Sequence, residues 1–218
     1  LLHRMDFVHK LPVIVPGKVN TEKQKAFVAR YEQMKRELKE TEVILFSDGV
    51  HPTHNTKKIR CWVKKGTNKQ IKTNTGRERL NIQGAYSVED STITTYYSET
   101  INAIAVMAFF DEVQKAYAWE TMIYIICDNA RYYKNKDVTA YLAKESCRIK
   151  LVHLPSYSPN LNFIERLWKY MHQKVIGVKY REKFKEFETD IKSFFANTDE
   201  HKEELQSFIG TKLHVIEV

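Results

Sequence analysis

The chain has 218 residues, of which 43% are hydrophobic and 12% aromatic. A chain of this size and composition buries enough apolar surface to offset its ordering entropy, which excludes an intrinsically disordered protein and favours one globular domain. No apolar run approaches the roughly 20 residues that a membrane-spanning helix needs. Residues 1–15 also lack the pattern of a secretory signal peptide. We therefore expect a cytoplasmic protein that has no membrane partner.

The positive charge of the chain is concentrated in one segment. Lys and Arg number 35 against 27 Asp and Glu, a surplus of +8. Residues 56–79 contain nine basic residues and one acid, so this segment carries the whole surplus and the rest of the chain is neutral. A local basic patch is typical of a nucleic-acid track. The predicted phosphate contacts are Lys57, Lys58, Arg60, Lys64, Lys65, Lys69, Lys72, Arg77 and Arg79.

Three other features of composition have ordinary interpretations. The three cysteines, Cys61, Cys127 and Cys147, have no paired spacing, so we expect reduced, buried thiols. His51 and His54 lie close to Asp48, but no distant Cys or His pair completes a zinc site. Trp62, within the basic segment, is expected either to pack in the core or to stack on a displaced base.

The first half of the chain predicts a helix followed by strands. Residues 1–19 contain helix-breaking Pro and Gly and are expected to form a linker. Asn20 or Thr21 should cap a helix that ends near Thr41, with Gln24 placed for a capping box. An apolar strand then runs from Glu42 to Phe46. Further strands, read as an antiparallel meander, are predicted at residues 59–64, 79–88 and 92–97.

The second half alternates helices with strands. Helices are predicted at residues 98–117, 135–145, 162–175 and 181–196, and strands at residues 122–127 and 149–154. This order indicates an α/β protein with a mixed sheet flanked by helices, as in the RNase H-like (retroviral integrase-like) fold. We expect one domain over residues 20–197, with residues 198–218 forming a tail or short helix.

Three acids have positions suited to metal chemistry. Asp48 and Asp128 each follow an apolar strand, where open α/β sheets place ligands, and Glu165 falls in the first turn of an amphipathic helix. Phosphodiester cleavage can use two divalent ions about 4 Å apart, held by carboxylates and water. Taken alone, each acid is better explained as an ordinary turn or cap residue, so the metal site depends on the residues around them.

The residues around these acids resemble a known family. Asp128-Asn129-Ala130 and the block from Leu154 to Trp168 (LPSYSPNLNFIERLW) are similar to the second and third catalytic blocks of mariner-superfamily DDE transposases. The block from Phe46 to His54 (FSDGVHPTH) resembles the first block of the bacterial insertion-sequence branch. The resemblance covers about residues 1–180.

The resemblance implies a DNA transposase that cuts transposon ends and joins them to target DNA. It implies that Asp48 bridges two Mg²⁺ or Mn²⁺ ions and that Asp128 and Glu165 each complete one of them. His51, Asn129 and Asn162 are expected to support this site, and Tyr157 and Pro159 to shape the loop before Glu165. Ser156, Asn160, Phe163 and Tyr133 depart from residues common in the family, but none of them is one of the three acids.

The family also suggests partners and a setting. We expect transposon ends and target DNA as double-stranded partners, a homodimer in the DNA complex, and a bacterial cytoplasmic protein associated with the nucleoid. Residues 1–19 would then lead from an N-terminal DNA-binding region outside this chain. Two alternatives remain: a non-catalytic DNA-binding protein derived from a transposase, and an RNase H-like nuclease or resolvase.

Overall fold

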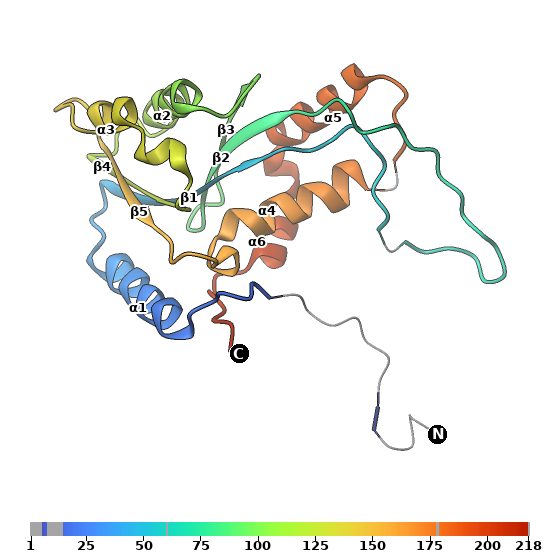
Figure 1. Cartoon of the computed structure of the whole chain (residues 1–218), viewed down its shortest axis with the longest axis horizontal. Helices are drawn as coiled ribbons and strands as arrows, with labels where there is room; N and C mark the ends of the chain where they lie inside the picture. Colours follow the sequence, from blue (N-terminus) through green and yellow to red (C-terminus); the bar gives the residue numbers. More distant parts are fainter. Residues whose placement is uncertain (1–5, 8–14, 60, 178, 218) are drawn as a thin grey trace.

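The computed structural model describes residues 6–7, 15–59, 61–177 and 179–217. At its centre is a five-stranded mixed sheet with helices on both faces (Figure 1). The strand order is β3-β2-β1-β4-β5, formed by β1 (Glu42–Val50), β2 (Asn81–Ser87), β3 (Ile93–Ser98), β4 (Met122–Cys127) and β5 (Ile149–His153). The first three strands form an antiparallel meander, and β4 and β5 run parallel to β1. The predicted mixed sheet flanked by helices is confirmed.

Two hydrophobic cores lie on opposite faces of this sheet. One face is covered by α1 (Thr21–Glu37), α4 (Phe163–Met171), α5 (Phe184–Ala196) and α6 (Lys202–Ile209). The other is covered by α2 (Ala103–Ala116) and α3 (Lys136–Leu142). Because successive strand residues point to opposite faces, Phe46 of β1 packs with the first group and Leu45 with the second.

The meander differs from the predicted one in its members. The described residues of the range 59–64 form no strand, and Arg60 lies outside the described residues. Residues 61–64 of this segment are exposed and only Ile59 is half-buried, so the segment buries no apolar face against a neighbouring strand. The third strand of the meander is β1, which continues to Val50 because it pairs with β2 beyond the end of its pairing with β4.

The helices begin where side chains cap them. Asn20 caps α1 as predicted, accepting a hydrogen bond of 2.8 Å from the Lys23 backbone N–H, and the helix ends at Glu37, before the predicted Thr41. Asn102 caps α2 in the same way, so this helix begins at Ala103, later than predicted, and Ser98 ends β3. The predicted capping box at Gln24 is wrong, since its side chain is buried against a distant loop.

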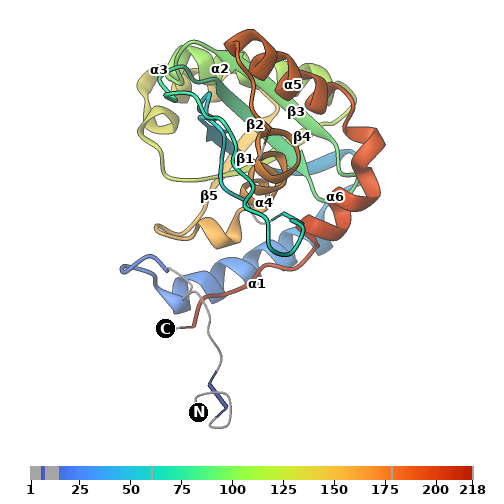
Figure 2. The ribbon, with the colours of Figure 1, turned by 90° about the vertical axis from the view of Figure 1, so that its right-hand side faces the viewer.

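The C-terminal segment is part of the packed molecule. Leu205 and Ile209 of α6 are buried on the face that carries α4. The chain then runs back beside α1 (Figure 2), where the Thr21 hydroxyl donates to the Ile216 carbonyl over 3.0 Å. In the part of the chain that is described, no helix is both long and apolar enough to cross a membrane.

Candidate active site

The fold brings the three predicted acids to one pocket. Asp48 lies within β1, not past its end as predicted, but it is two residues beyond Phe46, the last residue paired with β4. Asp128 lies two residues beyond Ile126, the partner of Phe46. Both aspartates therefore lie at the same level, beyond the paired part of the adjacent parallel strands β1 and β4. Glu165 is the third residue of α4, which packs on β1. All three line a pocket of roughly 440 Å³.

The electrostatics of Asp48 reflect this crowding of acids. The pKa of Asp48 is raised from 3.8 to about 7, first by burial and then by the charges of Glu165 and Asp128, against opposing contributions from Gly49 and Trp168. Loss of hydration and the charge of Asp128 also raise the pKa of Glu165, although this side chain remains exposed. The pocket therefore concentrates negative charge that a bound cation would relieve.

Asn162 connects the start of α4 to the strand that carries Asp48. Its buried amide donates 3.1 Å to the carbonyl of Ser47, the residue before Asp48. The side chain consequently makes no capping bond to α4, and its amide oxygen is buried without a partner in the structure. This bond fixes the first turn of α4, and with it Glu165, against β1.

Trp168 fixes the same helix from the other side. Gly84 lies opposite Asp48 in the β1–β2 register, and a Cβ built on it would come within 2.5 Å of the Trp168 ring. Only glycine allows this approach of the indole to the backbone of β2. The buried indole N–H makes no hydrogen bond of normal geometry among the described residues, but it is close enough to Asp48 to lower the pKa of that carboxyl. Neither Gly84 nor Trp168 had a predicted role.

The Asp128 loop is held by its own polar groups. The Asp128 carboxylate accepts a hydrogen bond of 2.9 Å from the Ala130 N–H, and the Asn129 amide donates 2.7 Å to the Leu154 carbonyl. Asn129 thus joins the loop after β4 to the loop after β5. Nδ1 of His153 lies 3.0 Å from the Asp128 carbonyl oxygen, which makes the imidazole the donor in this contact.

A buried glutamine braces the loop that forms the opposite wall of the pocket. Gln24 of α1 donates from Nε2 to Ser158 Oγ over 3.0 Å and to Asn160 Oδ1 over 3.2 Å. Its Oε1 accepts from Asn160 Nδ2 over 3.1 Å and from the Ile216 N–H over 3.0 Å. Gln24 precedes Phe27 by three positions and Tyr31 by seven, so it lies on the apolar face of the helix. A polar residue on that face is the sequence signal for this role.

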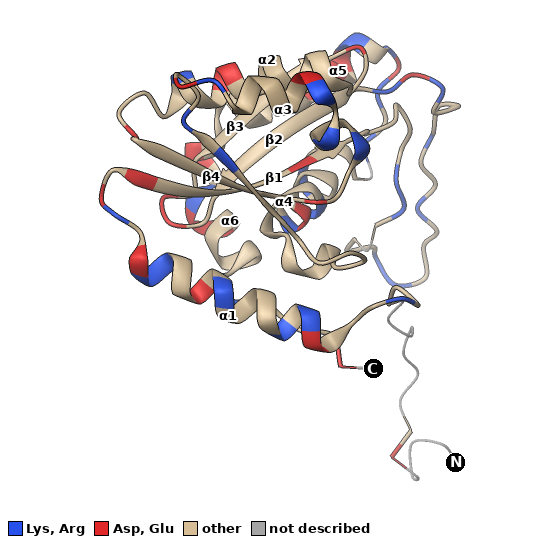
Figure 3. Ribbon diagram, turned by 60° about the vertical axis from the view of Figure 1, so that its left-hand side comes forward, with Lys and Arg blue, Asp and Glu red and all other residues tan. Residues whose placement is uncertain are grey.

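The basic segment forms a long loop outside the pocket. Residues 51–80 leave β1 and return to β2, and the lysines and arginines of this loop lie along both of its arms (Figure 3). Apart from Lys57, which is half-buried, the described members of the predicted DNA track are exposed; Arg60 lies outside the described residues. Trp62 and Cys61 are also exposed, so neither packs in the core. None of these residues lines the acidic pocket.

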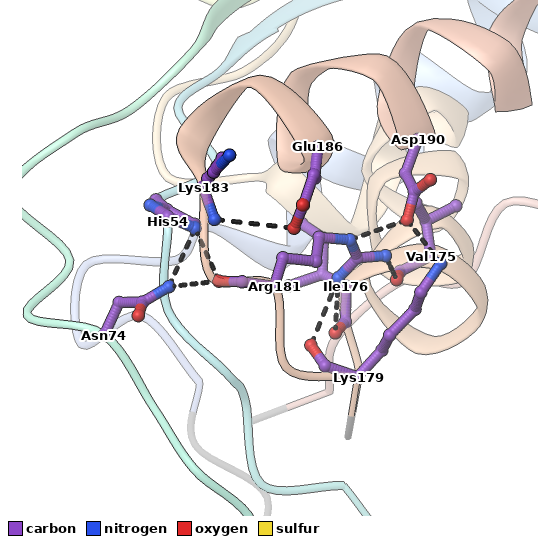
Figure 4. Close-up of polar contacts among 9 residues, drawn as sticks. All are labelled: His54, Asn74, Val175, Ile176, Lys179, Arg181, Lys183, Glu186 and Asp190. Carbon is purple, nitrogen blue, oxygen red and sulfur yellow. Dashed lines mark hydrogen bonds and ion pairs between the residues drawn. The ribbon is translucent and has the colours of Figure 1, made fainter.

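The base of this loop is tied to the segment before α5 (Figure 4). His54 Nε2 lies 3.0 Å from the Arg181 carbonyl oxygen, to which the Asn74 amide also donates over 2.6 Å. The Arg181 guanidinium is buried and donates from Nε to Asp190 over 2.7 Å. Although burial alone would raise the pKa of Asp190, hydrogen bonds from Lys179 and Arg181 hold it below its usual value.

The two histidines serve structural contacts in this arrangement. His51 Nδ1 lies 2.7 Å from the Asn81 side-chain oxygen, and His51 does not line the pocket. His54 is buried at the base of the basic loop. Among the described residues, no group of three or more His, Cys, Asp and Glu side chains is close enough to hold a metal ion by itself. The three acids therefore surround the pocket without converging on one point.

Comparison with known proteins identifies the family. Residues 43–189 match the DDE superfamily endonuclease family, and the chain belongs to it. The matched range contains all three acids. The predicted DDE family is thus confirmed.

Individual relatives agree with this assignment. The chain is 23% identical over 132 residues to an uncharacterized 39 kDa protein of insertion element IS630 from Shigella sonnei, covering 61% of this chain and 38% of the relative. The Mos1 transposase, solved as a paired-end complex with the left transposon end, is similar with a TM-score of 0.68 and 17% identity. That match covers 98% of this chain and 70% of the other.

The isolated catalytic domain of the Mos1 mariner transposase is similar in fold over most of both chains. The TM-score is 0.59 at 14% identity, over 90% of this chain and 91% of that domain. The predicted RNase H-like fold is therefore confirmed. The match to the insertion-element protein spans less than half of that relative's length.

Proposed function

We propose that this chain is the catalytic domain of a DNA transposase, which hydrolyses phosphodiester bonds at transposon ends and joins the freed ends to target DNA. The observation that supports this function is the meeting of Asp48, Asp128 and Glu165, from β1, the loop after β4 and α4, at one pocket of a DDE-family fold. Two of the acids share a sheet edge, and the third is fixed there by Asn162.

The donor set of this pocket fits two divalent ions, Mg²⁺ or Mn²⁺. Carboxylate oxygens are the ligands that these ions prefer, and Mg²⁺ usually keeps several waters in place of further protein ligands. Three acids around an open pocket leave room for water and a phosphate, which suits this coordination better than a site formed by protein ligands alone. Burial, followed by the charges of Glu165 and Asp128, raises the pKa of Asp48, and bound cations would offset both effects. Mos1 paired-end complexes have been solved with Mg and with Mn.

Each acid has its own part in the proposed chemistry. Asp48 would be a ligand shared by the two ions, and Asp128 and Glu165 would each complete the ligand set of one of them. Bound ions supply a nucleophile near neutral pH and offset charge on the transferred phosphoryl group. The protein holds the carboxylates on rigid elements: β1 carries Asp48, Asn129 ties the Asp128 loop to Leu154, and α4 orients Glu165.

The basic loop is the proposed DNA track. Lys57, Lys58, Arg60, Lys64, Lys65, Lys69, Lys72, Arg77 and Arg79 would neutralise phosphates of the duplex, releasing counterions, and Trp62 is exposed for stacking on a base. The tie between this loop and Arg181 would keep its base fixed relative to the pocket. By likeness to the paired-end complexes of Mos1, we propose that two copies of the chain act on two ends.

Nicking of supercoiled plasmid tests this function. The wild-type chain should convert supercoiled to open-circular DNA with Mn²⁺ and not with EDTA. Asp128→Asn keeps the size of the side chain but removes the charge, and should reduce nicking at least about 100-fold, because a metal ligand is lost. Asp137→Asn, an equivalent change of an exposed acid on α3, is the matched control and should nick as the wild type does.

Two results would contradict the proposal. Equal nicking by Asp128→Asn and the wild type would remove Asp128 from the reaction. Absence of nicking by the wild type, together with salt-sensitive DNA binding, would instead support the non-catalytic DNA-binding protein. Detection of strand joining in addition to nicking separates a transposase from a nuclease.

A further inference from the structure

We propose that Tyr157 contacts substrate DNA by stacking on a nucleobase next to the phosphate held in the pocket. This inference rests on the proposed function and assigns part of its substrate site. Tyr157 lines the same pocket as the three acids, and 53% of its surface is exposed there. A large aromatic side chain that the fold leaves exposed beside the acids needs a reason, because its burial elsewhere would stabilise the protein.

The backbone of Tyr157 is strained. Its φ is +59°, in the left-handed region that L-residues with bulky side chains rarely adopt. Glycine would adopt this conformation without strain. Among the described residues, only two other non-glycine residues share a positive φ, Asp6 and Ser91, and neither is aromatic. Strained residues persist where the surrounding structure holds them, and they cluster at ligand sites.

The surroundings of Tyr157 hold it in that conformation. The next residue, Ser158, is 4% exposed, donates to the Ser156 carbonyl over 3.3 Å and accepts from Gln24 over 3.0 Å. Asn160 is bound by the same glutamine. A residue of α1 thus fixes the loop directly after Tyr157, while no described hydrogen bond holds the ring itself.

The local chemistry fits a nucleotide. An aromatic face stacks on any base, which suits an enzyme that must bind DNA next to a reacting phosphate. The exposed Lys18 ammonium lies over the Tyr157 ring, 5.9 Å from its centre, so a cation for a neighbouring phosphate stands over one face of the ring. The pocket acids would hold the ions, the ring a base, and Lys18 the backbone between them.

Glycine at position 157 separates a contact role from a structural one. Tyr157→Gly removes the ring and relieves the strain, so its Tm should not fall, whereas Mn²⁺-dependent plasmid nicking should fall about tenfold through loss of one stacking contact. Tyr157→Phe keeps the ring and should nick within about twofold of the wild type. Ser91→Gly relieves strain at a turn far along the chain from the pocket and should leave nicking unchanged.

Photo-crosslinking detects the contact between Tyr157 and DNA independently of nicking activity. A short duplex carrying 5-iodouracil in its terminal base pairs, bound with Ca²⁺ in place of Mn²⁺, should crosslink to Tyr157 as mapped by mass spectrometry. Crosslinking only to Trp62 or elsewhere, or wild-type nicking by Tyr157→Gly, would overturn the inference while leaving the proposed function intact. Failure of the wild type to nick would overturn the function, and the crosslink would still decide the contact.

Discussion

Asp48 shares a partly dehydrated pocket with two other carboxylates, and its pKa is raised to about 7. A carboxyl group with a raised pKa contributes stability at low pH, and this contribution is lost as the pH rises through 7. In EDTA, Asp48→Asn should therefore be more stable than the wild type at pH 8, by about 3–8 °C in Tm after allowance for solvent screening. The difference should shrink towards pH 5, where the wild-type carboxyl is protonated.

Thermal denaturation of both proteins at pH 5 and pH 8 checks this prediction, with Asp137→Asn as the control. The same Asp48→Asn variant should not nick DNA. A variant that is more stable and inactive is the expected signature of a site where acids are held together for function against their mutual repulsion. Equal Tm values for Asp48→Asn and the wild type at pH 8 would count against the proposed crowding of charge.

Individual residues differ in how far the sequence reveals them. The three acids were predicted because each follows a strand or begins a helix, and because the residues around each one resemble a catalytic block of the family. The roles of Gln24, Trp168 and Tyr157 could not be read in the same way. Gln24 acts across 134 residues, Trp168 depends on a glycine in another strand, and the strain at Tyr157 is a backbone property. Each depends on tertiary contacts that local patterns do not encode.

Among the elements, α1 has a second task besides covering the sheet. Through Gln24 it holds the loop that leads to α4, so we expect Gln24→Ala to leave Ser158, Asn160 and the Ile216 N–H without their partner. The free energy of unfolding should fall by about 1–3 kcal/mol. Nicking measured well below Tm should fall by about tenfold, because a small displacement of the loop misplaces the reacting groups.

The matched control is Gln33→Ala, on the exposed side of the same helix, where the side chain bonds only Glu37. It should change stability by less than about 0.5 kcal/mol and leave nicking unchanged. Urea denaturation and the plasmid assay measure both effects. If Gln24→Ala and Gln33→Ala had equal stability and equal nicking, α1 would cover the sheet without holding the loop that leads to α4.

Element prediction succeeded where hydrophobic pattern decides structure and failed where pairing decides it. The strand β4 was located closely because it reads as a continuous apolar run, and β5 because Ile149, Leu151 and Val152 form a short apolar cluster. The strand expected at residues 59–64 was wrong because Cys61, Trp62 and Val63 are exposed and pair with no strand in the described structure. The end of β1 was placed too early because pairing with β2, not apolar pattern, extends it through Asp48.

At the scale of the whole molecule, charge is divided between two regions. The acids converge on the pocket at one edge of the sheet, and the basic surplus lies on the loop between β1 and β2. An otherwise neutral fold with a basic loop and an acidic pocket is suited to bind a polyanion beside bound cations. The fold class and this division of charge could be predicted from the sequence, whereas the path of the loop could not, because it has no regular structure in its described residues.

The central claim is that Asp48, Asp128 and Glu165 bind divalent metal ions. Anomalous diffraction from a crystal of the chain soaked in Mn²⁺ tests it most directly. Manganese peaks should appear in the pocket within coordination distance of oxygens from all three carboxylates. Asp48, as the shared ligand, should lie between two manganese peaks. An empty pocket in crystals that diffract with Mn²⁺ present, or manganese bound only elsewhere, would contradict the claim.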